Sequence, residues 1–231
     1  VDANEEVEIR SEISGIVTVI YFKEGTNVSK GQSLFKVNDS ELKAQLIQVK
    51  TKQNLAAENQ RRAKLLLEKE AISQEDYDAS LAELKSMQAQ TQLINAQISK
   101  TLVRAPFSGK VGLRMISPGT YVTPTTAITN LVNTNKLKIT FRIPEKYASE
   151  IKNNTNVTFT TSGSLEEYTA TIYATEPMVD EVTRTLQVRA LANNATGKLK
   201  AGIYANVKLP LERIKNAILV PTEAIIPIQN E

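Results

Sequence analysis

The sequence contains no cysteine, no histidine and no tryptophan among its 231 residues. Without cysteine and histidine, the chain has no thiol nucleophile, no Ser-His-Asp triad, no disulfide and no zinc or iron–sulfur site of the usual ligands. Aromatic residues make up only 5% of the chain. We therefore expect long helices or slim β modules in place of a compact aromatic core. We also expect no catalytic activity, no cofactor and no bound metal.

The charge is modest, and long apolar runs are missing. A net charge of +3 is too small to indicate nucleic-acid binding, and no Lys/Arg cluster stands beside stacking aromatic residues. We expect no nucleic-acid partner. No run approaches the roughly 18 apolar residues of a membrane span, and no signal-peptide pattern is present. The sequence thus predicts either a cytosolic protein or a mature or trimmed form of an exported one.

One pattern occurs twice, at a constant separation of 94 residues (Gly109 against Gly15). Each copy has a glycine, a second glycine ten residues later and a valine three residues after that, followed by two apolar residues. The copies are Gly15, Gly25, Val28, Leu34, Val37 and Gly109, Gly119, Val122, Ile128, Leu131. The spacing predicts short strands and tight turns, with the four glycines as structural turn residues. Gly25 and Gly119 stand where a turn needs positive φ. We expect a two-fold β-sandwich built from two half-motifs.

Between the two copies, residues 39–100 contain neither proline nor glycine and are rich in Ala, Gln, Leu, Lys and Glu. This composition strongly favours helix. A break is expected just before Ser73, which is followed three residues later by Asp76, as in a capping box. Asp39 or Ser40 is predicted to cap the first helix. Because both ends return to the same small β domain, the two helices must run antiparallel.

Mostly apolar positions, with a few polar ones among them, recur at steps of four and three along both predicted helices, which is the spacing of a coiled coil. On the first helix they are Leu42, Leu46, Val49, Gln53, Ala56, Gln60, Ala63 and Leu67. On the second they are Tyr77, Ser80, Leu84, Met87, Thr91, Ile94 and Ile98. We expect these residues to form a thin and partly polar seam.

From Leu137 onward the sequence alternates as strands do. Leu137, Ile139, Phe141 and Ile143 are apolar on one face, and Pro144 is expected in the first turn of a short helix. Strand-like runs recur around residues 157–161, 168–175, 186–191 and 204–211. Their spacing predicts a small antiparallel β-barrel.

The repeated pattern resembles the two halves of a biotinyl or lipoyl domain. Carrier versions of that domain hold a modified lysine where the halves meet. Here more than 60 residues stand at the junction, and neither Met-Lys-Met nor Asp-Lys-Ala occurs in them. The resemblance therefore implies the fold without the swinging-arm chemistry.

The predicted hairpin tip resembles that of periplasmic adaptor proteins, also called membrane fusion proteins, of RND-type tripartite efflux pumps. Arg62 is followed four residues later by Leu66 and seven residues after that by Ser73, before the pair Tyr77-Asp78. The resemblance implies that Arg62, Leu66 and Ser73 dock on a TolC-type outer-membrane channel.

The resemblance covers nearly the whole chain and implies an elongated, multidomain protein of the mixed α+β class. The expected parts are a β-barrel domain of residues 1–9 with 134–211, a lipoyl-like domain of 10–38 with 101–133, an α-helical hairpin of 39–100, and a partial membrane-proximal segment of 212–231.

The resemblance further implies a non-catalytic adaptor in the periplasm of a double-membrane bacterium, anchored to or associated with the inner membrane. Its partners would be an inner-membrane RND transporter, a TolC-type channel and further copies of itself in a ring of six. One alternative is an adaptor of an ABC or type I export system. Another is a biotin or lipoate carrier subunit, against which the missing lysine motif argues.

Overall fold

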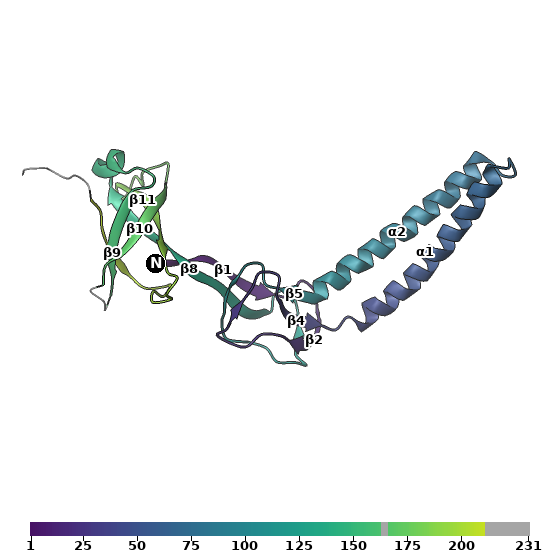
Figure 1. Ribbon diagram of the computed structural model, residues 1–231, viewed down its shortest axis with the longest axis horizontal. Helices are drawn as coiled ribbons and strands as arrows, with labels where there is room; N and C mark the ends of the chain where they lie inside the picture. The colour runs from purple at the N-terminus through teal and green to yellow at the C-terminus, as the bar shows by residue number, and fades with distance from the viewer. Residues whose placement is uncertain (163–165, 211–231) are drawn as a thin grey trace, which may run out of the picture. The chain divides into compact units, whose positions relative to one another are not determined.

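The computed structural model describes residues 1–162 and 166–210, which form two compact units (Figure 1). One unit is Glu5–Thr134, and the other joins Val1–Asn4 to the described residues from Asn135 onward. The predicted membrane-proximal segment, residues 212–231, lies outside the described residues. Among the described residues, no helix is both long and apolar enough to cross a membrane.

The unit Glu5–Thr134 contains two small β layers. The first copy of the repeat supplies β2 (Gly15–Ile20), β3 (Asn27–Val28) and β4 (Ser33–Val37). The second copy supplies β6 (Gly109–Val111), β7 (Tyr121–Val122) and the start of β8 (Ala127–Pro144). One layer has the order β5-β4-β2-β7, where β5 is Leu102–Arg104. In the other layer β6 pairs with both β3 and β8, and β1 (Asp2–Arg10) pairs with β8.

The two copies of the repeat exchange strands. β2 of the first copy pairs antiparallel with β7 of the second, and β3 pairs with β6. The same backbone hydrogen bond occurs in both halves: the Gly25 amide donates to the Val111 carbonyl at 3.0 Å, and the Gly119 amide donates to the Val17 carbonyl at 2.8 Å. Neither copy completes a layer from its own strands, so the sandwich requires both.

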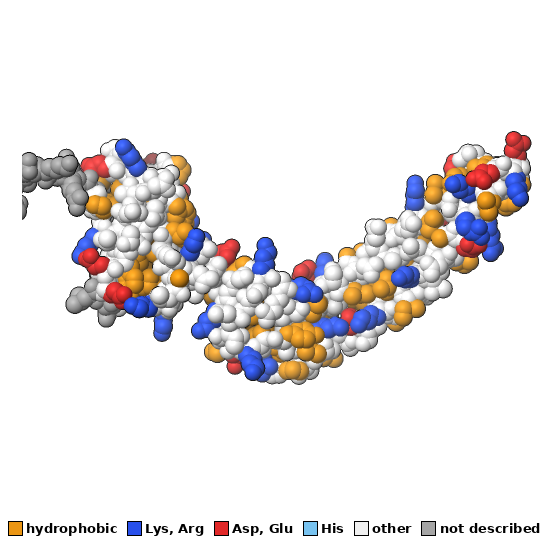
Figure 2. Space-filling view, viewed as in Figure 1, with side chains coloured by type: hydrophobic (Ala, Val, Ile, Leu, Met, Phe, Trp, Pro, Cys, Tyr) orange, Lys and Arg blue, Asp and Glu red, His pale blue; other side chains and the backbone are white. Residues whose placement is uncertain are grey.

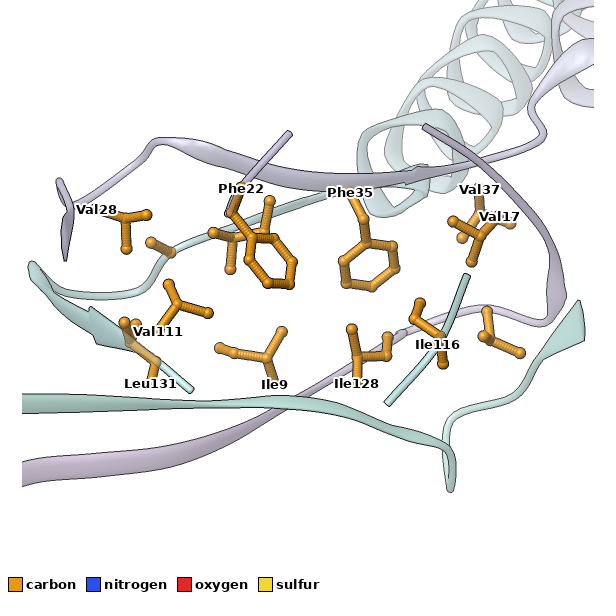
Figure 3. Close-up of a cluster of buried hydrophobic side chains, with 13 residues drawn as sticks. Ile9, Val17, Phe22, Val28, Phe35, Val37, Val111, Ile116, Ile128 and Leu131 are labelled. Atoms are coloured by element: carbon orange, nitrogen blue, oxygen red, sulfur yellow. The ribbon is translucent and has the colours of Figure 1, made fainter. Parts of the chain in front are cut away.

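Equivalent positions of the two copies fill a single core (Figure 3). Val17 and Val111, which correspond in the repeat, are each 1% exposed. Phe22 and Phe35 point into this core from one layer toward the side that carries Ile9. Full burial of such a side chain contributes about 1.5–3 kcal/mol. The sandwich is therefore held by aliphatic side chains and very few aromatic rings, as the composition predicts.

The four repeat glycines divide into two kinds. Gly25 and Gly119 lie in turns with φ of +70° and +92°, a region that favours glycine. Gly15 and Gly109 are the first residues of strands β2 and β6, so the prediction that they are turn residues is wrong. The reason for glycine there is close packing, because a Cβ on Gly109 would lie 2.6 Å from the Val132 carbonyl oxygen. A Cβ on Gly15 would meet a valine of strand β4 at the same distance.

Helices α1 (Ser40–Leu67) and α2 (Gln74–Thr101) have 28 residues each and form the hairpin (Figure 1). Every residue of the predicted seam is buried or half-buried. Two hydrogen bonds cross the seam: Thr91 Oγ1 donates to Gln53 Oε1 at 2.5 Å, and Gln60 Nε2 donates to the Tyr77 hydroxyl at 3.2 Å. The predicted seam, with its partly polar character, is confirmed.

The start of α1 differs from the prediction. The Asp39 side chain makes no capping hydrogen bond, and Asn38 Oδ1 instead accepts from the Ser40 amide at 3.0 Å. The Asp39 carboxylate lies 3.1 Å from the Nζ atoms of both Lys36 and Lys43. The prediction that Asp39 or Ser40 caps this helix is therefore wrong, because the two lysines engage the carboxylate and Asn38 satisfies the amide.

The other unit is built on an antiparallel sheet of order β12-β9-β10-β11-β8. Its further strands are β9 (Asn156–Thr161), β10 (Tyr168–Thr175), β11 (Thr185–Asn193) and β12 (Ala205–Lys208). Leu137, Ile139 and Ile143 are buried, as the alternation predicts, while Phe141 is half-buried against the same core. Pro144 precedes the 3₁₀ helix η1 (Glu145–Glu150). The unit therefore has its own apolar core behind an antiparallel sheet, which agrees with the β-barrel architecture expected from the sequence.

Candidate functional site at the hairpin tip

Helix α1 ends in a tight turn that leads into the tip. The Ala71 amide donates to the Leu66 carbonyl at 2.8 Å, and the Glu70 amide donates to the Leu67 carbonyl at 2.8 Å. This is the hydrogen-bond pattern of a Schellman motif, in which the left-handed residue is usually glycine. Here that residue is Glu70, with φ of +54°. The turn thus satisfies carbonyl groups that the helix end leaves open and reverses the chain within a few residues.

Helix α2 begins with a capping box. Ser73 Oγ accepts from the Asp76 amide at 3.1 Å, and Asp76 Oδ2 accepts from the Ser73 amide at 3.2 Å and from the Ser73 hydroxyl at 2.7 Å. These bonds lower the pKa of the Asp76 carboxyl. The capping box expected from the sequence is confirmed. Ser73 therefore fixes the turn, and its hydroxyl is engaged with Asp76.

Arg62 and Leu66 share an outward face of α1, since residues four apart lie on the same side of a helix. The Arg62 side chain is 67% exposed, and Leu66 is 44% exposed. The seam runs instead through Ala63 and Leu67, which are half-buried. Ser73 lies across the turn and shares no hydrogen bond with Arg62 or Leu66 in the part of the chain that the structure describes. The structure thus brings two of the three predicted residues onto one face and places the third at the start of α2.

Glu58, which sequence reasoning missed, contacts Arg62 and also its neighbour Arg61. Arg62 Nε donates to Glu58 Oε1 at 3.2 Å. Arg61 donates to the same carboxylate twice, from Nε to Oε2 at 2.9 Å and from Nη2 to Oε1 at 2.7 Å. These hydrogen bonds, those of Arg61 first, lower the pKa of Glu58 to about 2. The spacing of an acid three and four residues before two arginines is a signal that the sequence does contain.

The tip also exposes apolar surface. Leu65 is 46% exposed, one position before Leu66, and sequence reasoning did not single it out. Figure 2 shows side chains of both charge signs gathered around the tip. Guanidinium groups beside exposed leucines can bind carboxylates and bury apolar surface together, which suits a protein partner. Within residues 1–162 and 166–210, no group of three or more acidic side chains could hold a metal ion.

Two solved structures share the architecture of this chain. A MacA-MexA chimera that contains the Pseudomonas aeruginosa MexA α-hairpin domain matches with a TM-score of 0.82 at 22% identity, over 99% of this chain and 88% of that one. A membrane fusion protein from Streptococcus pneumoniae matches with a TM-score of 0.71 at 18% identity, over 90% of this chain and 97% of that one. A β-sandwich interrupted by a helical hairpin and joined to a barrel-type unit is thus the fold class of this chain.

The family follows from the sequence itself. Residues 5–134 match the model described as RND MFP, barrel-sandwich hybrid domain, and residues 137–213 match a CusB-like β-barrel domain. The chain belongs to the RND membrane fusion protein family.

Curated relatives match along most of this chain. The solvent efflux pump periplasmic linker SrpA of Pseudomonas putida is 29% identical over 239 residues, which cover 94% of this chain and 61% of the relative. The multidrug resistance protein MdtA of Xenorhabdus bovienii is 26% identical over 251 residues, which cover 97% of this chain and 60% of the relative. The chain thus spans about three-fifths of the length of these relatives.

Proposed function

We propose that this chain is the periplasmic adaptor of a tripartite drug efflux pump, bridging an inner-membrane RND transporter and a TolC-type outer-membrane channel without catalysing a reaction. Membership of the RND membrane fusion protein family supports this proposal. So does the name of a relative such as SrpA, a periplasmic linker of a solvent efflux pump. The observation that carries the proposal is the hairpin tip, where Arg62 and Leu66 are exposed on one face beside a doubly capped turn.

In this proposal the hairpin docks by its tip. The Schellman turn and the capping box hold the tip in one conformation before it binds, which reduces the entropy lost on docking. Arg62 then pairs with an acceptor on the channel, Leu66 is covered by apolar surface, and Ser73 keeps the turn in shape.

The other parts of the chain have proposed tasks as well. The lipoyl-like domain (10–38 with 101–133) forms rings of six copies around a conduit. The barrel domain (1–9 with 134–211) and the segment 212–231 face the transporter. The protein works in the periplasm, attached to or associated with the inner membrane.

In-cell photo-cross-linking tests the proposal. The probe is placed at Lys69, an exposed residue of the turn that leaves Arg62, Leu66 and Ser73 intact. We expect it to capture an outer-membrane channel protein. Arg62→Asp should lower this capture at least about tenfold, the equivalent of about 1.4 kcal/mol, while the purified variant keeps its helix content.

Lys52→Asp is the matched control, because it makes the same charge change at an exposed position of α1 away from the tip. It should leave capture unchanged. Capture of cytosolic enzyme subunits alone, or of nothing, would reject the adaptor function. An equal loss in both variants would remove Arg62 from the docking site.

A further inference from the structure

Two adjacent arginines at the tip are held differently by one carboxylate. Arg61 uses Nε and Nη2 together, at 2.9 and 2.7 Å, so it grips both oxygens of Glu58 side-on. Arg62 reaches the same carboxylate through Nε alone, at 3.2 Å. Glu58 therefore bonds the edge of the Arg61 guanidinium that carries Nε and Nη2, but it bonds only one of the three nitrogens of Arg62.

The geometry of a guanidinium gives this difference a consequence. Its five N–H donors lie in one plane, and a carboxylate can bind either the edge formed by Nε and one terminal nitrogen or the end formed by both terminal nitrogens. Within the described residues, the structure records no hydrogen bond from the terminal nitrogens of Arg62. Nε is thus engaged by Glu58, whereas the outer end of the group has no recorded partner there and the side chain as a whole is 67% exposed.

We propose that Glu58 is a positioning residue of the docking site: it tethers Arg62 through Nε so that both terminal nitrogens are presented, beside Leu66, to a carboxylate of the outer-membrane channel. The inference rests on the function proposed above and deepens it. It names the chemistry that the channel offers, an Asp or Glu side chain bound end-on. It also explains why Arg62, and not its neighbour Arg61, is the docking cation.

The local surroundings support this assignment. Leu66 and Leu65 stand one turn beyond the two arginines, and both are close to half exposed. Apolar surface around a charge pair excludes water when the partner binds, which strengthens the pair relative to one in open solvent. Glu58 lies one turn before Arg62 on the same face of α1 and two turns before Leu66, so it contacts Arg62 from the end of that face farther from the tip.

A double-mutant cycle with the Lys69 probe tests the tether in cells. Glu58→Gln should lower channel capture about two- to fivefold, the size expected for an exposed ion pair. In an Arg62→Gln background the same change should have no further effect, because Glu58 acts only through Arg62. Glu58→Asp, which keeps the charge, should restore part of the capture. Glu68→Gln, an exposed acid in the same stretch, is the matched control and should have no effect.

The results that would overturn the proposal are equally specific. An undiminished capture with Glu58→Gln, or the same loss with and without Arg62, would show that Glu58 does not act through Arg62. Arg62→Lys should also lower capture, because an ammonium cannot be tethered at one nitrogen and present two others. Full capture with Arg62→Lys would reject the end-on carboxylate.

A measurement on the purified chain separates this inference from the proposed function. The Arg62 Nε–Hε resonance, assigned by its loss in Arg62→Lys, should exchange slowly with solvent and lose that protection in Glu58→Gln. Unchanged exchange in Glu58→Gln would reject the tether whatever the cells show. A protected resonance together with a wild-type probe that captures no channel would reject the docking function and leave only the tether.

Discussion

Replacing Gly109 by alanine tests whether the sandwich depends on the close approach of strand β6 to the backbone of strand β8. The added Cβ would lie 2.6 Å from the carbonyl oxygen and 2.9 Å from the carbonyl carbon of Val132. Both are backbone atoms of β8, so no side-chain rotation relieves the contact, and β6 and β8 must separate. The adjoining pair Val111 and Leu131 is fully buried and would lose contacts in that shift. Overpacking of this kind costs about 2–3 kcal/mol.

Gly112→Ala is the matched control, three residues along the chain. Its Cβ would meet nothing nearer than the Asn130 carbonyl oxygen at 3.4 Å, and a compatible Gly→Ala change is neutral or stabilising by up to about 1 kcal/mol. A difference in stability between the two variants therefore measures the contact of the added Cβ with the Val132 backbone, and not the loss of a glycine as such.

Native-state hydrogen exchange at the Val111 amide is the suitable assay. That amide donates to the Thr26 carbonyl at 3.0 Å and so reports opening of the sandwich, independently of the helices. A loss of about 2–3 kcal/mol corresponds to exchange about 30- to 150-fold faster in Gly109→Ala. Exchange within twofold of wild type, or equal acceleration in Gly112→Ala, would show that strand separation is not the cost of a side chain at Gly109.

Three further changes test the hairpin. Glu70→Gly should stabilise the tip by about 0.5–1 kcal/mol by removing a left-handed non-glycine residue; faster amide exchange in the tip turn would contradict this. Ser73→Ala should cost about 1 kcal/mol and fray the start of α2, again read by amide exchange; unchanged exchange would mean that the cap is dispensable. Burial alone would raise the pKa of Asp39, but hydrogen bonds from Lys43 and Lys36 lower it, so its stabilisation is present above pH 4 or so and is lost as the pH falls further. Asp39→Asn should therefore lower stability by about 1–2 kcal/mol near pH 7, and thermal melts of the two proteins should converge as the pH falls through the lowered pKa of Asp39; a difference that does not change with pH would assign the effect to packing.

The hairpin was predictable because its determinants are local. Helix propensity, the seam period and the Ser73 capping box each depend on residues within a few positions of one another. The same local logic was wrong at Asp39, whose backbone has φ of −116° and ψ of 10° and not the extended geometry of a capping residue. The nearby lysines offer its carboxylate a stronger partner than the helix amides, and a capping rule does not weigh that competition.

The candidate docking site was predictable in part. The spacing of Arg62, Leu66 and Ser73 is visible in the sequence, and its role as a docking site stays a prediction. That Arg62 and Leu66 point away from the seam follows from the helix pairing. The role of Glu58 required side-chain geometry, because the sequence places it within reach of both arginines and does not say which nitrogens it engages.

Local chemistry accounts for the periodic features of this chain: the repeated apolar positions, the left-handed turns at Gly25 and Gly119, and two long helices uninterrupted by proline or glycine. The pairing of β2 with β7 and of β3 with β6 has no such local source, since strand partners are chosen by contacts between residues far apart in the chain. The same holds for Gly15 and Gly109, where a side chain would collide with the Val37 side chain and with the Val132 backbone respectively. Periodicity and turns arise from neighbours along the chain, whereas strand partners and close approaches arise only when distant segments pack together.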